Sequence, residues 1–270
     1  METLMVGWHT SVKDLLNCSD EFFQKHKVFQ VFIGNPRSLN VPSFSDLGIL
    51  LKRYPHLEIV VHSPYVVNLC KSSGDKNYVA TLGYTIAVAQ KLDELGVKYL
   101  VTHIGGRPET MSIKESTMNL LGFCQKFEWS TQGNKIKLCL ENDSGSKKGT
   151  KMGHLKVLST VIRKMNSERI RMTFDAEHAY AAGFNIESEE EIRQYEDIIE
   201  VVHWNAVPSN VEFGGHLDRH STTSFYESKA NPLPVYNVLY NGKRPFIFEV
   251  ESPVFVKSNL EYLREVEKNG

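Results

Sequence analysis

Histidine, aspartate and glutamate residues recur where short apolar runs of this 270-residue sequence end. Six of them end, or nearly end, such a run: His62, His103, Glu141, Asp175, His203 and Glu249. His178 stands three residues after Asp175, and Asp218 and His220 stand in the segment GGHLDRH. Nitrogen and oxygen donors without sulfur suit zinc, or manganese at a harder site. The four cysteines form no CxxC pair, so a thiolate zinc site is not expected.

Each of these residues has a simpler interpretation when it is taken alone. A lone histidine at a strand end is about as often a hydrogen-bonded structural residue as a ligand, and a lone glutamate there is more often an ion-pair partner. Taken together the simpler interpretations fail, because uncompensated carboxylates packed this closely could not all stay ionised. Nine ligands with one bridging carboxylate suffice for three metal ions.

The elements that must position these residues alternate along the chain. The apolar runs predict strands at 4–9, 29–34, 59–63, 99–104, 137–142, 170–175, 201–205 and 246–251. Between them, helices are predicted at 43–54, 77–95, 112–129, 154–164, 188–196 and 257–267. This order predicts an α/β fold, a single-domain (β/α)₈ TIM barrel that spans residues 1–270. The strand ends of a barrel converge on one face, where catalytic groups lie.

The long irregular stretch 208–245 is expected to be a functional loop with one poor helix.

Composition argues against a DNA-binding protein before the site is considered. Lys+Arg number 31 and Asp+Glu number 32, giving a net charge of −1, whereas nucleic-acid binders often carry a basic excess. A local basic surface can still be balanced by acidic groups elsewhere. Three divalent ions set against four carboxylates and a bridging hydroxide leave a slightly positive cluster. Such a charge fits a phosphodiester, and metal clusters of this kind belong to phosphoryl chemistry.

The sequence shows neither a signal peptide nor an apolar run of the roughly 20 residues that a membrane span requires. We therefore expect free thiols and a cytoplasmic or nuclear protein that is not secreted.

At these residues the sequence resembles the endonuclease IV family of AP endonucleases. The motifs are GWHTS (7–11), VHSPYVVNL (61–69), VTHIGG (101–106), LENDSG (140–145), FDAEHAYAAGFNI (174–186), VVHWN (201–205), LDRH (217–220) and PFIFE (245–249). They cover nearly the whole chain in family order. The segment 30–37 is most similar to short members from large DNA viruses, for which a virion location would also fit.

The resemblance implies a distribution of ligands over three zinc ions, with manganese as an alternative at one site. The first ion takes His62, His103 and Glu141. The second takes Glu141, Asp175, His203 and Glu249. The third takes His178, Asp218 and His220.

The resemblance also implies the reaction. A hydroxide between the first two ions attacks phosphorus, with Glu141 as the catalytic bridging ligand. The implied function is base excision repair of DNA: cleavage of the phosphodiester 5′ of an abasic site, leaving a 3′-hydroxyl and a 5′-deoxyribose phosphate. The family also removes blocked 3′ ends. The expected partner is double-stranded DNA with abasic sites, bound by a monomer.

Two loops are implied to hold the flipped-out abasic nucleotide. Arg37 follows the second predicted strand, and Tyr65 and Val66 follow the third. Wedge side chains are a general need when a buried backbone position must be reached. The simpler interpretation is that Tyr65 and Val66 pack on the barrel rim.

The chain departs from the family outside the ligands. The family usually has an aspartate, and often a lysine, where Ala206, Val207 and Pro208 stand here. The stretch 221–225 replaces a glycine-containing segment. Both changes put the preferred lesion in question rather than the chemistry.

Two alternatives remain. A xylose-isomerase-like sugar isomerase or epimerase has the same barrel but needs one or two metals and has no need for His178, Asp218 and His220. A catalytically inactive DNA-binding module is disfavoured by the complete ligand set.

Overall fold

Eight parallel strands close into a barrel in the computed structural model, which describes residues 4–145, 151–219, 223–250 and 252–269. Each strand pairs with the next along the chain, and the last pairs with the first. The strands are β1 (Val6–Thr10), β2 (Val28–Phe32), β3 (Glu58–His62), β4 (Tyr99–His103), β5 (Lys137–Glu141), β6 (Ile170–Asp175), β7 (Ile199–His203) and β8 (Phe246–Phe248). The predicted (β/α)₈ barrel is confirmed.

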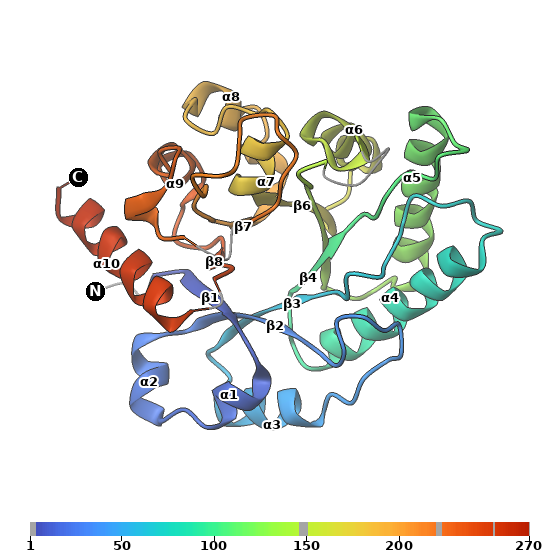
Figure 1. Ribbon diagram of the computed structural model, residues 1–270. Coiled ribbons are helices and arrows are strands. Elements are labelled where there is room, and N and C mark those ends of the chain that lie inside the picture. The colour runs from blue at the N-terminus through green and yellow to red at the C-terminus, as the bar shows by residue number, and fades with distance from the viewer. Residues whose placement is uncertain (1–3, 146–150, 220–222, 251, 270) are drawn as a thin grey trace.

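Helices follow the strands and surround the barrel (Figure 1). They are α1 (Val12–Leu16), α2 (Asp20–Lys25), α3 (Ser45–Arg53), α4 (Lys76–Glu94), α5 (Ile113–Ser130), α6 (Leu155–Met165), α7 (Ala176–Ala181), α8 (Glu189–Arg193), α9 (Leu233–Leu239) and α10 (Pro253–Asn269). Short 3₁₀ turns are η1 (Lys151–Gly153), η2 (Glu196–Ile198) and η4 (Phe225–Glu227). The six predicted helices are confirmed within a few residues, and α9 is the helix expected in the stretch 208–245.

Within the described ranges, the core consists of two apolar clusters. The larger lies between the strands and the helices around them, and includes Phe29, Leu100 and Leu140. The smaller consists of residues from six strands: Val28, Val60, Tyr99, Val101, Cys139, Val201 and Ile247. These positions alternate with the first set along the strands, so the smaller cluster fills the barrel interior.

This alternation decides where the polar strand ends point. Side chains two residues apart lie on the same face of a strand. Inward-facing Val60, Val101 and Cys139 are therefore followed by inward-facing His62, His103 and Glu141. Val201 and Ile247 are followed in the same way by His203 and Glu249. The barrel thus presents a polar layer above its apolar interior.

Among the helices that the structure describes, none has the length and apolar character needed to cross a lipid bilayer. The four cysteines are free thiols, as expected, and Cys139 lies buried in the barrel interior.

Candidate metal centre

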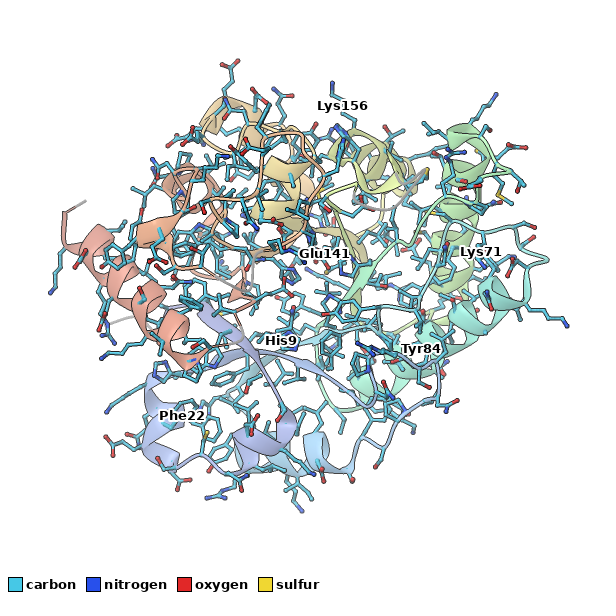
Figure 2. The ribbon with its side chains drawn as sticks, in the orientation of Figure 1. His9, Phe22, Lys71, Tyr84, Glu141 and Lys156 are labelled. Carbon is cyan, nitrogen blue, oxygen red and sulfur yellow. The ribbon has the colours of Figure 1, made fainter. Side chains whose placement is uncertain are left out.

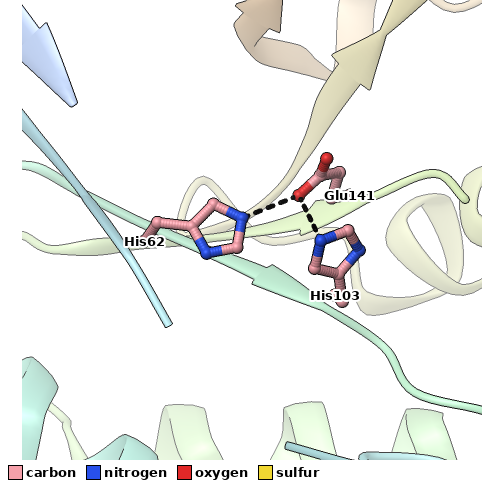
Figure 3. Close-up of side chains that lie close together, drawn as sticks. All are labelled: His62, His103 and Glu141. Atoms are coloured by element: carbon pink, nitrogen blue, oxygen red, sulfur yellow. Dashed lines mark hydrogen bonds and ion pairs between the residues drawn. The ribbon is translucent and has the colours of Figure 1, made fainter. Parts of the chain in front are cut away.

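Glu141 lies at the centre of the polar layer. It ends β5, is 1% exposed, and lies in the middle of the molecule (Figure 2). Its Oε2 atom is 3.2 Å from His62 Nε2 and 3.6 Å from His103 Nε2 (Figure 3). Its Oε1 atom is 3.0 Å from His203 Nδ1 and 3.5 Å from His178 Nδ1. The two carboxylate oxygens therefore face separate groups of histidines.

Two further carboxylates, those of Asp175 and Glu249, lie beside His203. Glu249 Oε2 lies 3.0 Å and Asp175 Oδ2 lies 3.7 Å from His203 Nδ1. Asp175 also caps α7, since its Oδ1 accepts the backbone N–H of His178 at 2.7 Å. Asn205 donates to Asp175 Oδ2 at 2.7 Å and to Glu249 Oε2 at 3.2 Å. These hydrogen bonds from the Asn205 side chain hold the two carboxylates beside the His203 imidazole.

The third predicted group is described in part. His178 Nε2 lies 3.2 Å from Asp218 Oδ2, which comes from the loop after β7. The third member, His220, lies outside the described residues. Eight of the nine predicted ligands are thus described, and all eight lie around one cavity mouth or within contact of its lining residues.

The histidines are oriented by acceptors on their outer sides. His62 Nδ1 donates to the carbonyl of Ser63 at 2.7 Å, and His178 Nδ1 donates to the carbonyl of Asn142 at 2.9 Å. A carbonyl only accepts, so Nδ1 carries a proton in both rings, and Nε2 faces Glu141 in His62 and Asp218 in His178. This is the arrangement in which metal-binding histidines are held in proteins. The donor set therefore fits divalent cations.

Burial and neighbouring charges together shift the pKa values of these side chains when no cation is bound. Burial favours the neutral form of Glu141, but His103 and His203 outweigh it and hold its pKa well below 4.5. Burial opposes charge on His178 and His203, but the neighbouring carboxylates raise the pKa of both well above 6.5. Burial lowers the pKa of His103 to about 4.

Among the described residues there are three sets of possible metal ligands, and within each set the donor atoms lie within 4.8 Å of one another. The first is His62, His103 and Glu141, and the second is Glu141, Asp175, His203 and Glu249. These match the first two predicted metal sites in membership. The third set is Asp175, Glu177 and His178. Glu177 is completely buried and accepts the backbone N–H of Arg219 at 3.1 Å.

The sequence interpretation missed Glu177, and also Gln30 and Asn205. Gln30 and Asn205 are neutral amides inside or next to apolar strands, which carry no metal-ligand signal of their own. The period of two could have identified Gln30, because it follows inward-facing Val28 on β2.

The cavity above the centre has a volume of about 990 Å³. The predicted ligands that line it are His62, His103, Glu141, His178, Asp218 and Glu249. Tyr65 forms part of its wall, with ring centroids 5.2 Å from Phe32 and 5.8 Å from His62. Burial first, then Glu249 and Glu141, raise the pKa of Tyr65 to about 12, so its hydroxyl stays protonated.

The two predicted DNA-contact loops lie next to each other. Tyr65 N–H donates to the carbonyl of Pro36 at 2.8 Å, which joins the loop after β3 to the loop carrying Arg37. Arg37 is exposed, Tyr65 is 53% exposed and Val66 is 44% exposed. Tyr65 also packs on the rim, as the simpler interpretation expected, and both features are compatible with a DNA contact.

The residues at 206–208, where the sequence differs from the endonuclease IV pattern, lie in the interior. Ala206, Val207 and Pro208 are buried, and Val207 N–H donates to Ser228 Oγ at 2.9 Å. These residues fasten the loop after β7 to the segment before α9.

Comparison with known proteins places this architecture in a family. Residues 27–265 match the xylose isomerase-like TIM barrel family. The Staphylococcus carnosus protein named "Probable endonuclease 4" is 26% identical over 243 residues, covering 82% of this chain and 79% of the relative. The chain belongs to the xylose isomerase-like TIM barrel family. The predicted resemblance to endonuclease IV is confirmed. The likeness to viral members stays a prediction.

Two solved structures show the same fold at low identity. Endonuclease IV from Thermus thermophilus has a TM-score of 0.75 and 19% identity, covering 98% of this chain and 99% of that one. A D-tagatose 3-epimerase-like protein has a TM-score of 0.77 and 22% identity, covering 97% of both chains. The barrel alone therefore does not distinguish a nuclease from an epimerase.

Proposed function

We propose that this protein is a zinc-dependent AP endonuclease. It hydrolyses the phosphodiester 5′ of an abasic site in double-stranded DNA, leaves a 3′-hydroxyl and a 5′-deoxyribose phosphate, and removes blocked 3′ ends. It acts as a monomer inside the cell. The observation that carries the proposal is the placing of Glu141, whose two oxygens face different histidines at 3.2 Å and 3.0 Å. A carboxylate so placed is suited to bridge two cations.

The chain's own residues would divide the work. His62, His103 and Glu141 would hold the first ion, and Glu141, Asp175, His203 and Glu249 would hold the second. His178 and Asp218, with His220, would hold the third. Divalent ions held there would supply Lewis-acid chemistry, activating a water molecule and stabilising negative charge at the phosphate. Asn205 keeps Asp175 and Glu249 oriented, and Tyr65 forms part of the cavity wall.

The pair of His178 and Asp218 favours the nuclease over a sugar epimerase. It lies beside Glu141 but adds donors that a one-metal or two-metal site does not require. Curated relatives named "Probable endonuclease 4" support the same choice.

Two measurements on the full-length protein test the proposal. Elemental analysis of protein purified without chelator should give close to three metal ions per chain, chiefly zinc. A duplex with one abasic site should be cut at that site, and an intact duplex should not. A reproducible content of about one metal, with turnover of D-tagatose and no DNA cleavage, would support the epimerase instead.

A further inference from the structure

Gln30 lies in the polar layer although it is neither acidic nor basic. It stands in the middle of β2, is completely buried, and faces inward because it follows Val28 at the period of two. A buried amide requires hydrogen-bond partners for both of its ends. Both ends of Gln30 find them on residues of the metal centre.

The amide nitrogen identifies the orientation of the group. Gln30 Nε2 lies 2.7 Å from Glu249 Oε1. An ionised carboxylate only accepts, so the atom that faces it must be the NH₂ group. The same NH₂ group lies 3.1 Å from His9 Nδ1. The amide oxygen of Gln30 is thereby directed to the other side.

The amide oxygen in turn orients His203. Gln30 Oε1 lies 2.8 Å from His203 Nε2. An amide oxygen only accepts, so Nε2 of His203 carries the proton and donates. The other nitrogen, Nδ1, then faces Glu141 Oε1 and Glu249 Oε2, both at 3.0 Å. His62 and His178 use backbone carbonyls for this purpose and turn the opposite nitrogen, Nε2, inward.

The structure assigns Gln30 as a positioning residue that sets the coordinating atoms of the second metal site. By accepting from His203 it leaves Nδ1 to bind the cation. By donating to Glu249 Oε1 it leaves Oε2, the oxygen beside His203, to bind the cation and favours binding through one oxygen. This inference rests on the proposed metal sites and deepens them: the geometry of the second site depends on a neutral side chain from β2.

A pair of substitutions tests the inference. Gln30→Met keeps the length and volume of the side chain but removes its hydrogen bonds with Glu249, His203 and His9. Gln30→Asn keeps the amide but is one methylene too short to reach both partners. Gln125→Met is a matched control, because Gln125 is exposed on α5. Removing an outer partner of a metal ligand typically weakens metal binding about 10–100-fold.

Two measurements follow zinc and cadmium binding in each purified variant, and a third follows the stability of the metal-free protein. Competition with a chelator should show one of the three zinc ions bound about 10–100-fold more weakly in both Gln30 variants and unchanged in Gln125→Met. Cadmium-113 NMR should show that one signal of the loaded protein shifts while the others stay. The melting temperature of the chelator-treated variants should stay close to that of the chelator-treated parent.

The outcomes separate the inference from its basis. Parent-like zinc affinity at every site in both Gln30 variants would overturn the positioning role. An equal fall in melting temperature with and without metal would also overturn it, because it would reveal a purely structural residue. A parent protein that binds no zinc would instead overturn the proposed function.

Discussion

At the scale of single residues, Glu141 is the most sensitive point of the centre. We predict that Glu141→Gln still binds abasic DNA but cleaves it at least about 100-fold more slowly, because the amide keeps the shape but loses the charge that joins two cations. Single-turnover cleavage beside a binding titration measures both properties.

The matched control for this prediction is Glu94→Gln. Glu94 lies on α4 in a surface ion pair with Lys91 at 2.8 Å and is not among the residues that line the cavity. Its loss should leave cleavage unchanged. If Glu141→Gln keeps its metals and cleaves within about tenfold of the parent, Glu141 does not bridge.

The sequence revealed most of the ionisable members of the site, but neither Glu177 nor the neutral amides. His62, His103 and Glu141 were predictable because burying an ionisable group at the end of an apolar run costs free energy unless a partner or a metal ion compensates it. Gln30 and Asn205 were not, because a neutral amide gives no comparable signal until its partners are known. The partners of Gln30 lie 173 and 219 positions away along the chain, a proximity that only the closed barrel creates.

At the scale of elements, strands and long helices were predictable, and among the short helices α8 was predicted whereas α1, α2 and α7 were not. The continuous apolar runs identified all eight strands, since both faces of each strand are covered. The helices α1, α2 and α7 have only five or six residues, too few for a helical period to appear. Their ends are determined by side-chain caps such as Ser19 and Asp175.

The pairing of β1 with β2 depends on Gly7. A Cβ atom at this position would lie 1.8 Å from the carbonyl oxygen of Val28. We predict that Gly7→Ala lowers the free energy of unfolding by about 3 kcal/mol or more, because the strands must separate to admit the methyl group. Denaturant unfolding measures the change.

A second glycine substitution supplies the control. Gly122 lies in α5, and a Cβ there would meet nothing within 4 Å. Gly122→Ala should stabilise the protein by up to about 1 kcal/mol through helix propensity. A Gly7→Ala protein as stable as the parent would show that β1 does not need this close approach.

The loops after β2 and β3 have a separate prediction. Arg37→Ala and Tyr65→Ala should reduce the preference for abasic over intact duplex and leave metal content unchanged, because neither side chain is placed among the donor atoms. Arg37→Ala should also reduce the slope of log affinity against log salt by about one, if its guanidinium replaces a counterion. Binding titrations at several salt concentrations measure both effects.

Arg53→Ala is the control for the loops. Arg53 ends α3 and pairs with Asp20 at 2.9 Å on the surface. Its removal should not change the selectivity for abasic DNA. Unchanged discrimination in both loop variants would return Arg37 and Tyr65 to a packing role on the rim.

At the scale of the whole molecule, the chain carries almost no net charge, and the metal centre gathers several ionisable side chains in a buried layer. Several buried ionisable groups there pair with one another when metal is absent. Folding is therefore linked to pH through these groups, and the direction of the linkage differs between them.

The pKa shifts of the histidines make the stability of the metal-free protein depend on pH both above and below 6.5. The pKa values of His178 and His203 are raised, so the stability they contribute is complete below 6.5 and is lost as the pH rises through their folded-state values. The pKa of His103 is lowered to about 4, so protons favour the unfolded chain as the pH falls from 6.5 to 4. Glu141, with its lowered pKa, adds to the loss in acid.

We therefore predict that the chelator-treated protein is most stable near pH 6.5 and that zinc changes this profile. Zinc binds deprotonated imidazoles, so its stabilising effect should grow as the pH rises from 6.5 to 8. Melting temperatures across pH 5–9, with and without zinc, measure both curves.

His178→Gln should flatten the decline in stability of the metal-free protein at alkaline pH, whereas His56→Gln, at an exposed position, should leave it unchanged. Parallel curves with and without zinc across this range would show that the histidines do not exchange protons for metal.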